Sequence, residues 1–333
     1  SCMVFGMVLL GGAVRLTGSG LSMVDWQPLI GIIPPFGQAQ WLAVFEQYKQ
    51  FPEFQQVNAS MELADFRFIY LMEYAHRVLG RLIGLVFLLP FLWFAARRQL
   101  SRALLQRSAV VFALGAAQGL LGWYMVKSGL VDRPEVSQYR LAAHLMLAFA
   151  IYGALLWLVL GLVRRARPDP AAARLRTLAL VLLGWTIVAV CAGAFVAGLD
   201  AGMAYNTFPL MDGRLLPAGA FAHRPWPVNF LDNPALVQFT HRILGIGLVV
   251  LAVWLWLRAL RAGVTGGVRT ALHWVAAAAA IQAGLGISTL LSQVALPLAL
   301  AHQGGALVLF SLVIWAVYEL GMGRRAPTSV PAR

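Results

Sequence analysis

Four of the six histidines lie inside long apolar segments. A polar side chain is costly there and usually has a partner, so a single such histidine is most often a hydrogen-bonded packing residue. Here each lies within about ten residues of the outer end of its segment, which predicts four imidazoles at similar depth in a membrane. Because neutral imidazole is a common metal ligand, the matched depth favours ligation of metal or haem. The four are His76, His144, His241 and His302.

Haem suits these histidines better than zinc does. A zinc site normally gathers further thiolate, imidazole or carboxylate ligands, whereas two histidines from two helices of an apolar bundle suit the axial positions of a haem. Small residues near the histidines would let the flat macrocycle approach the helix backbone. The glycines placed for this are Gly80, Gly84, Gly245, Gly247, Gly304 and Gly305.

An arginine directly follows the first histidine of each pair, as Arg77 and Arg242. Neighbouring residues on a helix point in different directions, so we expect the arginines to point toward the external boundary. They could pair with haem propionates there. Snorkelling of an interfacial cation explains them equally well, and both interpretations stay open.

One acid accompanies these histidines, and it is present in only one half of the chain. Glu73 lies three residues before His76, on the same helix face, whereas Gln238 precedes His241 at the matching position. A carboxyl in an apolar pocket could accept a proton or stabilise a cation; an interfacial acid is the alternative. The one-sided placement predicts a catalytic N-terminal half and a C-terminal half that holds a permanent haem and passes electrons.

Composition predicts a membrane protein. Of the 333 residues 60% are hydrophobic and 12% charged, and the mean hydropathy is +0.74; a soluble domain carries about twice that charged fraction. The long Leu-, Ala- and Val-rich runs indicate helices rather than barrel strands, whose side chains alternate over about ten residues. The first run reaches about fourteen residues, short for a span, so upstream residues are expected. Eight transmembrane helices are predicted, near 1–14, 66–95, 104–126, 137–163, 176–198, 235–258, 268–291 and 297–320.

The net charge of +13 orients the chain rather than marking a nucleic-acid site. The arginines concentrate in alternate short connections, near 97–107, 164–176 and 258–269, while most acids lie in the intervening loops. This is the positive-inside pattern. It predicts that the Arg-rich connections are cytoplasmic and that loops 15–65 and 199–234 are external.

An internal repeat divides the chain into two halves of four spans each. Because four is even, both halves share one orientation, and a pseudo-twofold axis along the membrane normal should relate the two four-helix bundles. The predicted division is 1–163, a cytoplasmic linker 164–175, and 176–333. His223 and His273 have no counterpart and are predicted to be structural or surface residues. The aligned pairs are Gly12-Ala13 with Gly193-Ala194, Pro28-Leu29 with Pro209-Leu210, His76–Gly80 with His241–Gly245, Gln118 and Gly122 with Gln282 and Gly286, and His144 with His302.

Five motifs carry a wider resemblance. They are Gly11–Ser22 (Gly-Gly-Ala-Val-Arg-Leu-Thr-Gly-Ser-Gly-Leu-Ser), Pro34-Pro35, Glu73-Tyr74-Ala75-His76-Arg77, Phe239-Thr240-His241-Arg242 and Ala301-His302-Gln303. Together they resemble the haem A synthase family. The resemblance covers nearly the whole chain, and its first two motifs are highly specific.

The resemblance implies a function and a cofactor. The function is conversion of haem O to haem A, by oxidation of a ring methyl to a formyl group, for the biogenesis of terminal oxidases. It implies haem B as cofactor in the C-terminal half, ligated by His241 and His302. It also implies that His76 and His144 bracket the substrate haem, with Glu73 acting in catalysis. The expected location is the bacterial cytoplasmic (inner) membrane or the equivalent mitochondrial inner membrane.

Two rival functions and several partners remain open. The chief rival is a dihaem b-type cytochrome that only transfers electrons, and the second is a haem transporter; neither needs an acid on one side only. A haem O synthase and an electron carrier are expected partners in the lipid bilayer, and a homo-oligomer is possible. Some family members carry a cysteine pair in the first external loop, but residues 15–65 contain no cysteine for a thiol-linked electron route.

Overall fold

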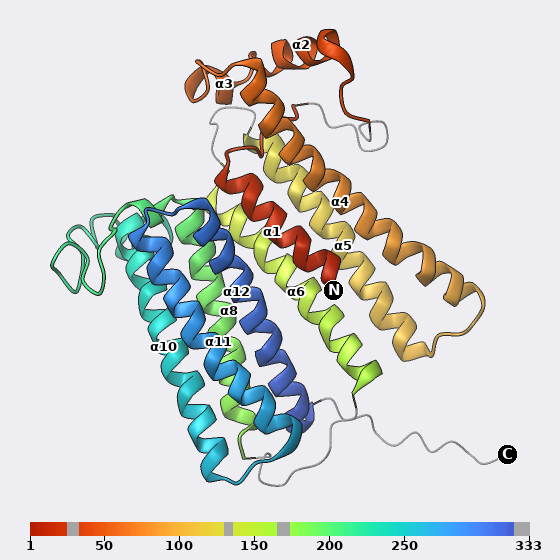
Figure 1. Cartoon of the computed structure of the whole chain (residues 1–333), viewed down its shortest axis with the longest axis vertical. Helices are drawn as coiled ribbons and strands as arrows, with labels where there is room; N and C mark the ends of the chain where they lie inside the picture. Colours follow the sequence, from red (N-terminus) through yellow and green to blue (C-terminus); the bar gives the residue numbers. More distant parts are fainter. Residues whose placement is uncertain (25–32, 130–135, 165–173, 323–333) are drawn as a thin grey trace. The chain divides into compact units, whose positions relative to one another are not determined.

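The chain is helical throughout its described part, residues 1–24, 33–129, 136–164 and 174–322 of a computed structural model (Figure 1). Within those residues the only extended pairing is an isolated bridge between Met211 and Arg214. The helices are α1 (Cys2–Leu16), α2 (Gly37–Tyr48), α3 (Pro52–Gln56), α4 (Leu63–Ala96), α5 (Arg102–Gly129), α6 (Gln138–Val163), α8 (Arg176–Gly198), α9 (Asn229–Asp232), α10 (Pro234–Arg261), α11 (Gly266–Leu291) and α12 (Leu296–Val317), with short turns η1 (Ala201–Met203), η2 (Trp226–Val228) and η3 (Tyr318–Met322).

Seven helices of the described part are long and apolar enough to cross a membrane: α4, α5, α6, α8, α10, α11 and α12. This confirms a multi-pass helical membrane protein. Helix α1 is apolar but has 15 residues, fewer than the ~20 that a span needs. The eighth span therefore stays a prediction.

Two compact units make up the chain, and they divide inside α6. Unit 1 is Ser1–Tyr152 and unit 2 is Gly153–Arg333. Most of the predicted linker 164–175, and the Pro28-Leu29 part of the repeat, lie outside the described residues.

Unit 2 contains a four-helix core of α8, α10, α11 and α12, which run side by side in Figure 1. Its fully buried positions alternate large and small residues, so that Leu255 and Leu272 pack beside Ala252 and Ala271. Small residues let membrane helices approach closely without a hydrophobic driving force between them. A close approach of this kind places four helices, and the two histidines that they carry, in one bundle.

Trp185 occupies the space at one glycine that was predicted to admit a macrocycle. A Cβ at Gly247 would lie 2.6 Å from the Trp185 ring, and the indole Nε1 donates to the carbonyl of Leu244 at 2.8 Å. Gly247 therefore serves helix packing, while Gly245 has nothing within 4 Å of its Cβ position.

Unit 1 is built around α4, which has 34 residues and is about 51 Å long at 1.5 Å per residue. That exceeds the ~30 Å hydrocarbon core, so part of the helix extends beyond the apolar layer. Helices α2 and α3 lie at the N-terminal end of α4, and α4 and α5 form an antiparallel hairpin (Figure 1). An aromatic cluster joins α2 and α3 to α4: Phe45, Tyr48 and Phe66 are buried, and the Tyr48 and Phe66 ring centres are 5.1 Å apart.

Buried asparagines order the segment before α10. Asn229 accepts from the main-chain N–H of His223 at 2.9 Å and donates to the carbonyl of Trp226 at 2.8 Å. Asn233 donates to Asn229 Oδ1 at 2.9 Å, and its own Oδ1 caps α10 by accepting from Ala235 N at 3.0 Å. The segment thereby fixes where α10 begins.

Candidate functional site

In unit 2 two histidines face each other at a separation that a metal ion could bridge. His241 from α10 and His302 from α12 have ring centres 6.3 Å apart and ring planes at 85°. An ion bonded at about 2 Å to one nitrogen of each ring would put the ring centres about 6 Å apart. His241 and His302 are therefore the residues that would hold one haem iron between them.

The hydrogen bonding of His241 selects the ring nitrogen that can bind iron. Its Nδ1 lies 3.1 Å from the carbonyl oxygen of Ala189 on α8. Since a carbonyl only accepts, Nδ1 carries the proton, and a neutral ring then has its lone pair on Nε2. This is the arrangement expected of a metal-ligating histidine whose other nitrogen is held by a carbonyl.

Each of the four predicted histidines lies against a glycine of an earlier helix of the same unit, on α1, α5, α8 or α11. A Cβ in place of the glycine hydrogen would approach the ring at or near the closest distance that real contacts show, so the ring could not stay where it is. The glycine thus sets the position of the imidazole. The distances from the ideal Cβ to Cε1 are 3.0 Å for Gly11 and His76, 3.1 Å for Gly122 and His144, 2.9 Å for Gly193 and His241, and 2.8 Å for Gly286 and His302.

Unit 1 brings its two histidines together as well. His76 and His144 are close enough to interact electrostatically. The Nδ1 atom of each is buried and has no hydrogen-bond partner, which is costly for a polar atom and typical of a site that takes a ligand. Within the described residues no three His, Cys, Asp or Glu side chains cluster as a closed metal site would need.

Glu73 is buried in a network that ties α4 to the segment after α1. Its Oε1 accepts from Arg77 Nη2 at 2.6 Å and Nε at 3.1 Å, and its Oε2 accepts from Ser22 Oγ at 2.8 Å and Met23 N at 2.7 Å. Arg77 also donates to the carbonyl of Met23 at 2.9 Å. The carboxylate is therefore held one helical turn from His76 by four donors.

Unit 2 repeats this clamp without the charge. Arg242 donates to the carbonyls of Thr207 and Tyr205, both at 2.8 Å, in the segment after α8. Gln238 donates to the same Tyr205 carbonyl at 3.1 Å. In both units the residue pair at i and i+4 holds a segment from earlier in the chain, the one after α1 in unit 1 and the one after α8 in unit 2, and only unit 1 uses a carboxylate for it.

The structure adds residues that sequence reasoning did not assign to the site. Gln118 donates to the carbonyl of His144 at 3.0 Å, and Gln282 to that of His302 at 2.9 Å. The repeat had already aligned both glutamines, and that was the signal. At the other end, the glycines that lie beside a histidine are Gly11 in unit 1 and Gly193 in unit 2.

Arg81 was missed altogether. It lies inside α4, five residues beyond His76, where α10 carries Ile246. It follows Glu73 and Arg77 at i+8 and i+4 on one helix stripe. A cation within a membrane span is itself a signal of function, and attention to all charges inside the spans would have found it.

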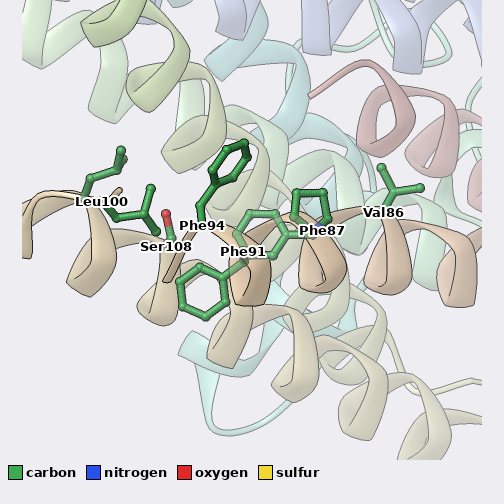
Figure 2. A pocket seen from close by; sticks show the side chains of 8 residues that line it. Val86, Phe87, Phe91, Phe94, Leu100 and Ser108 are labelled. Carbon is green, nitrogen blue, oxygen red and sulfur yellow. The ribbon is translucent and has the colours of Figure 1, made fainter. Parts of the chain in front are cut away.

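Two other features lie apart from the histidine pairs. His273 is exposed, and its Nδ1 is 2.6 Å from the carbonyl of Arg269 on its own helix. An apolar hollow of about 230 Å³ lies between the C-terminal part of α4 and the start of α5. Figure 2 shows Phe87, Phe91 and Phe94 around it, with the Ser108 hydroxyl as the polar group. It contains no acid or imidazole that could do chemistry.

Comparison with known proteins shows which family the chain resembles. A family model described as cytochrome oxidase assembly protein matches residues 1–314. A heme A synthase of Nitrosomonas eutropha is 48% identical over 322 residues, which are 96% of this chain and 90% of the relative. One of Rhodospirillum centenum is 52% identical, covering 96% and 85%, and one of Nitrosospira multiformis is 49% identical, covering 96% and 90%.

Proposed function

Since the chain belongs to the family of cytochrome oxidase assembly proteins, and its relatives include heme A synthases, we propose that it is a haem A synthase. It is an oxidoreductase that converts a ring methyl of haem O to the formyl group of haem A for terminal oxidase assembly. The observation that carries this assignment is the repeated histidine pair, one pair in each unit, with a carboxylate beside only one of them.

The two pairs take different haems in this proposal. His241 and His302 hold haem B, which supplies one-electron transfer when bound. The support is the 6.3 Å ring separation and the Nδ1 bond to Ala189. His76 and His144 bracket the substrate haem O. Unit 1 is therefore the catalytic half and unit 2 the half that holds the cofactor.

Glu73 provides the acid–base chemistry of the proposal. Oxidation of a methyl carbon removes at least one proton, and a carboxylate in an apolar site can accept it or stabilise positive charge developing on the carbon. The Arg77, Ser22 and Met23 donors orient the carboxylate. At least one of these hydrogen bonds must break before a carboxylate oxygen takes up a proton. Gln238 cannot do this in unit 2.

Arg77 and Arg242 are proposed to pair with haem propionates at the outer boundary. Both guanidinium groups already donate to main-chain carbonyls of the adjoining external segments. The same contacts would hold the arginines in place for a propionate, since a guanidinium carries five N–H donors in a planar fork.

The finer architecture is also proposed. We propose α1 as an eighth span, and two four-helix halves related by a pseudo-twofold along the membrane normal, in the bacterial inner membrane or its mitochondrial equivalent. The matching glycine–histidine contacts in the two units support a repeat. A haem O synthase is the proposed supplier of substrate, and an electron carrier exchanges electrons with the chain; self-association stays open.

Pigment analysis tests the proposal. Haems are extracted from the purified protein and identified by mass. Haem B together with haem O or haem A is the expected result. Haem B alone, with no haem A formed in cells that make haem O, would favour the dihaem electron carrier, and haem O that is bound but never converted would favour the transporter.

A further inference from the structure

Two glutamines occupy the same place in the two units. Each lies four residues before the glycine that contacts a histidine, so glutamine and glycine share one helix face. Gln118 and Gly122 lie on α5, and Gln282 and Gly286 on α11. Each glutamine donates its amide N–H to the main-chain carbonyl of the facing histidine, His144 or His302.

Gln282 also lies against the imidazole of His302. Its Nε2 is 3.1 Å from Nδ1 of the ring. Its Oε1 is buried without a hydrogen-bond partner and lies over Gly305, where a Cβ would overlap it. A buried amide oxygen without a donor is unfavourable, so this side chain holds an unused acceptor next to the ring.

Iron binding creates a need for that acceptor. A histidine that binds iron through Nε2 carries its proton on Nδ1, and this N–H needs an acceptor of its own. For His241 the acceptor is the carbonyl of Ala189 at 3.1 Å. For His302 the neighbouring group is the Gln282 amide, which presents its oxygen after a half-turn about the Cγ–Cδ bond. The nitrogen and oxygen ends of an amide have nearly the same shape.

The half-turn exchanges one bond for another. With Nε2 toward α12, Gln282 holds the His302 carbonyl at 2.9 Å and Nδ1 acts as an acceptor. With Oε1 toward α12, Gln282 Oε1 and the carbonyl oxygen of His302 would repel each other. The side chain therefore accepts a hydrogen bond from Nδ1–H of His302 instead. The carbonyl lies inside α12 and keeps its helical hydrogen bond.

Unit 1 shows the same unmatched atoms. Gln118 Oε1 and His144 Nδ1 are both buried without a hydrogen-bond partner, and the two residues are already joined by the bond from Gln118 Nε2 to His144 O at 3.0 Å. Once His144 Nδ1 carries a proton, it would donate a hydrogen bond to Gln118 Oε1, and both atoms would then have a partner.

We propose that Gln282 and Gln118 are positioning residues. Their side-chain oxygens accept a hydrogen bond from the Nδ1–H of His302 and His144, respectively, when Nε2 of that histidine binds iron. The acceptor raises the electron-donating strength of the histidine and so tunes the reduction potential of the haem. The inference rests on haem binding in the proposed function and goes beyond it, because it assigns the outer partner of one histidine in each pair.

Opposite shifts of the reduction potential test it. In the purified holoprotein the haem of unit 2 is titrated potentiometrically. Gln282→Glu supplies an anionic acceptor and lowers the midpoint potential. Gln282→Met removes the acceptor, raises the midpoint, and reduces haem retention by roughly 10–100-fold. Gln118→Met is the matched control, and it leaves the midpoint of the unit 2 haem unchanged.

The outcomes separate this inference from the proposed function. Wild-type midpoint and haem content in both Gln282 variants would overturn the inference and leave haem binding intact. Shifts of the same sign in both variants would also overturn it, since simple disruption produces them. If Gln282→Met does not accumulate, Gln282→Glu decides alone: a lowered midpoint supports the inference, and an unchanged or raised one refutes it. A wild-type protein without haem would instead refute the proposed function.

Discussion

Gly286 and His302 face each other across α11 and α12 so closely that a Cβ at position 286 would lie 2.8 Å from Cε1 of the ring. The missing side chain, and not a bond, thus sets the distance between the imidazole and its neighbouring helix. The same relationship holds for the other three histidines, which makes the glycines part of the proposed haem sites.

Gly286→Ala is therefore expected to displace His302. Overpacking of this kind costs about 1–3 kcal/mol, which corresponds to roughly 5- to 160-fold in haem affinity if the strain falls on the bound state. Haem content per protein after purification measures it. Gly284→Ala is the control, because nothing lies within 4 Å of that Cβ position; equal haem loss in both variants would show that only helix packing was disturbed.

Replacement of His302 or His241 by Ala separates the two haem sites. Either change removes one axial ligand of the proposed haem B and should abolish the stable haem absorbance, while circular dichroism shows the helices unchanged. His273→Ala is the control, since that exposed histidine lies apart from the pair. Full haem B absorbance in purified His302→Ala would refute the assignment.

Orientation in the membrane is testable from both sides. In a chain with Cys2 and Cys191 replaced, Leu215→Cys and Ser101→Cys place single thiols at exposed positions of two loops. The positive-inside pattern predicts that an impermeant thiol reagent reaches residue 215 from outside and residue 101 only from the cytoplasm. Labelling of residue 215 from the cytoplasm alone would reverse the orientation.

The contact between α2 and α3 is expected to make the stability of the protein depend on pH. Burial is the main cause that raises the pKa of Glu53 to about 7; the bond from Tyr48, at 2.9 Å, lowers the pKa, and the charge of Glu73 raises it. Because the folded-state pKa lies above the unfolded value of 4.5, stability is full below about pH 4.5 and is lost as pH rises to about 7. The loss is on the order of 3 kcal/mol for that part of the fold.

Glu53→Gln should remove this dependence. Thermal unfolding of the purified protein at pH 5 and pH 8 measures it: the wild type loses stability at pH 8 and the variant loses less. Glu46→Gln is the control, because that side chain is 63% exposed and pairs with Lys49 on the surface. An identical pH response in wild type and Glu53→Gln would mean that another group governs it.

The spans could be predicted closely because length and apolar composition decide them. The helix from 63 to 96 was expected over 66–95 and that from 176 to 198 over 176–198. A membrane imposes this, since each buried main-chain group must be bonded within its own helix. The division near 163 stays a prediction; the compact units of the structure divide inside α6, after Tyr152.

The contacts of the site were less accessible to sequence reasoning. The position of Glu73 beside His76 follows from helical spacing, but its partners Ser22 and Met23 are about fifty residues away and depend on how the external segment folds back. Whether Gly11 or Gly12 faces His76 depends on how α1 is rotated about its own axis. Neighbouring residues of a helix point about 100° apart around that axis. Alignment of a repeat does not resolve such a rotation.

Glu73→Gln tests the proposed catalytic role most directly. The variant keeps the shape of the side chain, removes its charge and one of its two accepting oxygens, and reproduces what unit 2 carries at Gln238. It should fold, retain haem B and form little or no haem A, with a loss of at least about a hundredfold if general-base help is missing. Haem A and haem O are quantified by mass in cells that make haem O.

The clamp around Glu73 requires a control, because Glu73→Gln also breaks the ion pair with Arg77, which is 2.6 Å long. Ser22→Ala removes one donor to the carboxylate, at 2.8 Å, and leaves the charge and the ion pair in place. If catalysis needs the carboxylate itself, Ser22→Ala keeps most of the haem A formation that Glu73→Gln loses. Equal loss in both variants would assign Glu73 to holding the external segment, and near-normal haem A in Glu73→Gln would end its catalytic role. Accumulation of a partly oxidised haem in Glu73→Gln would instead place the carboxylate at a later step of the oxidation, after the first electrons have left the methyl carbon.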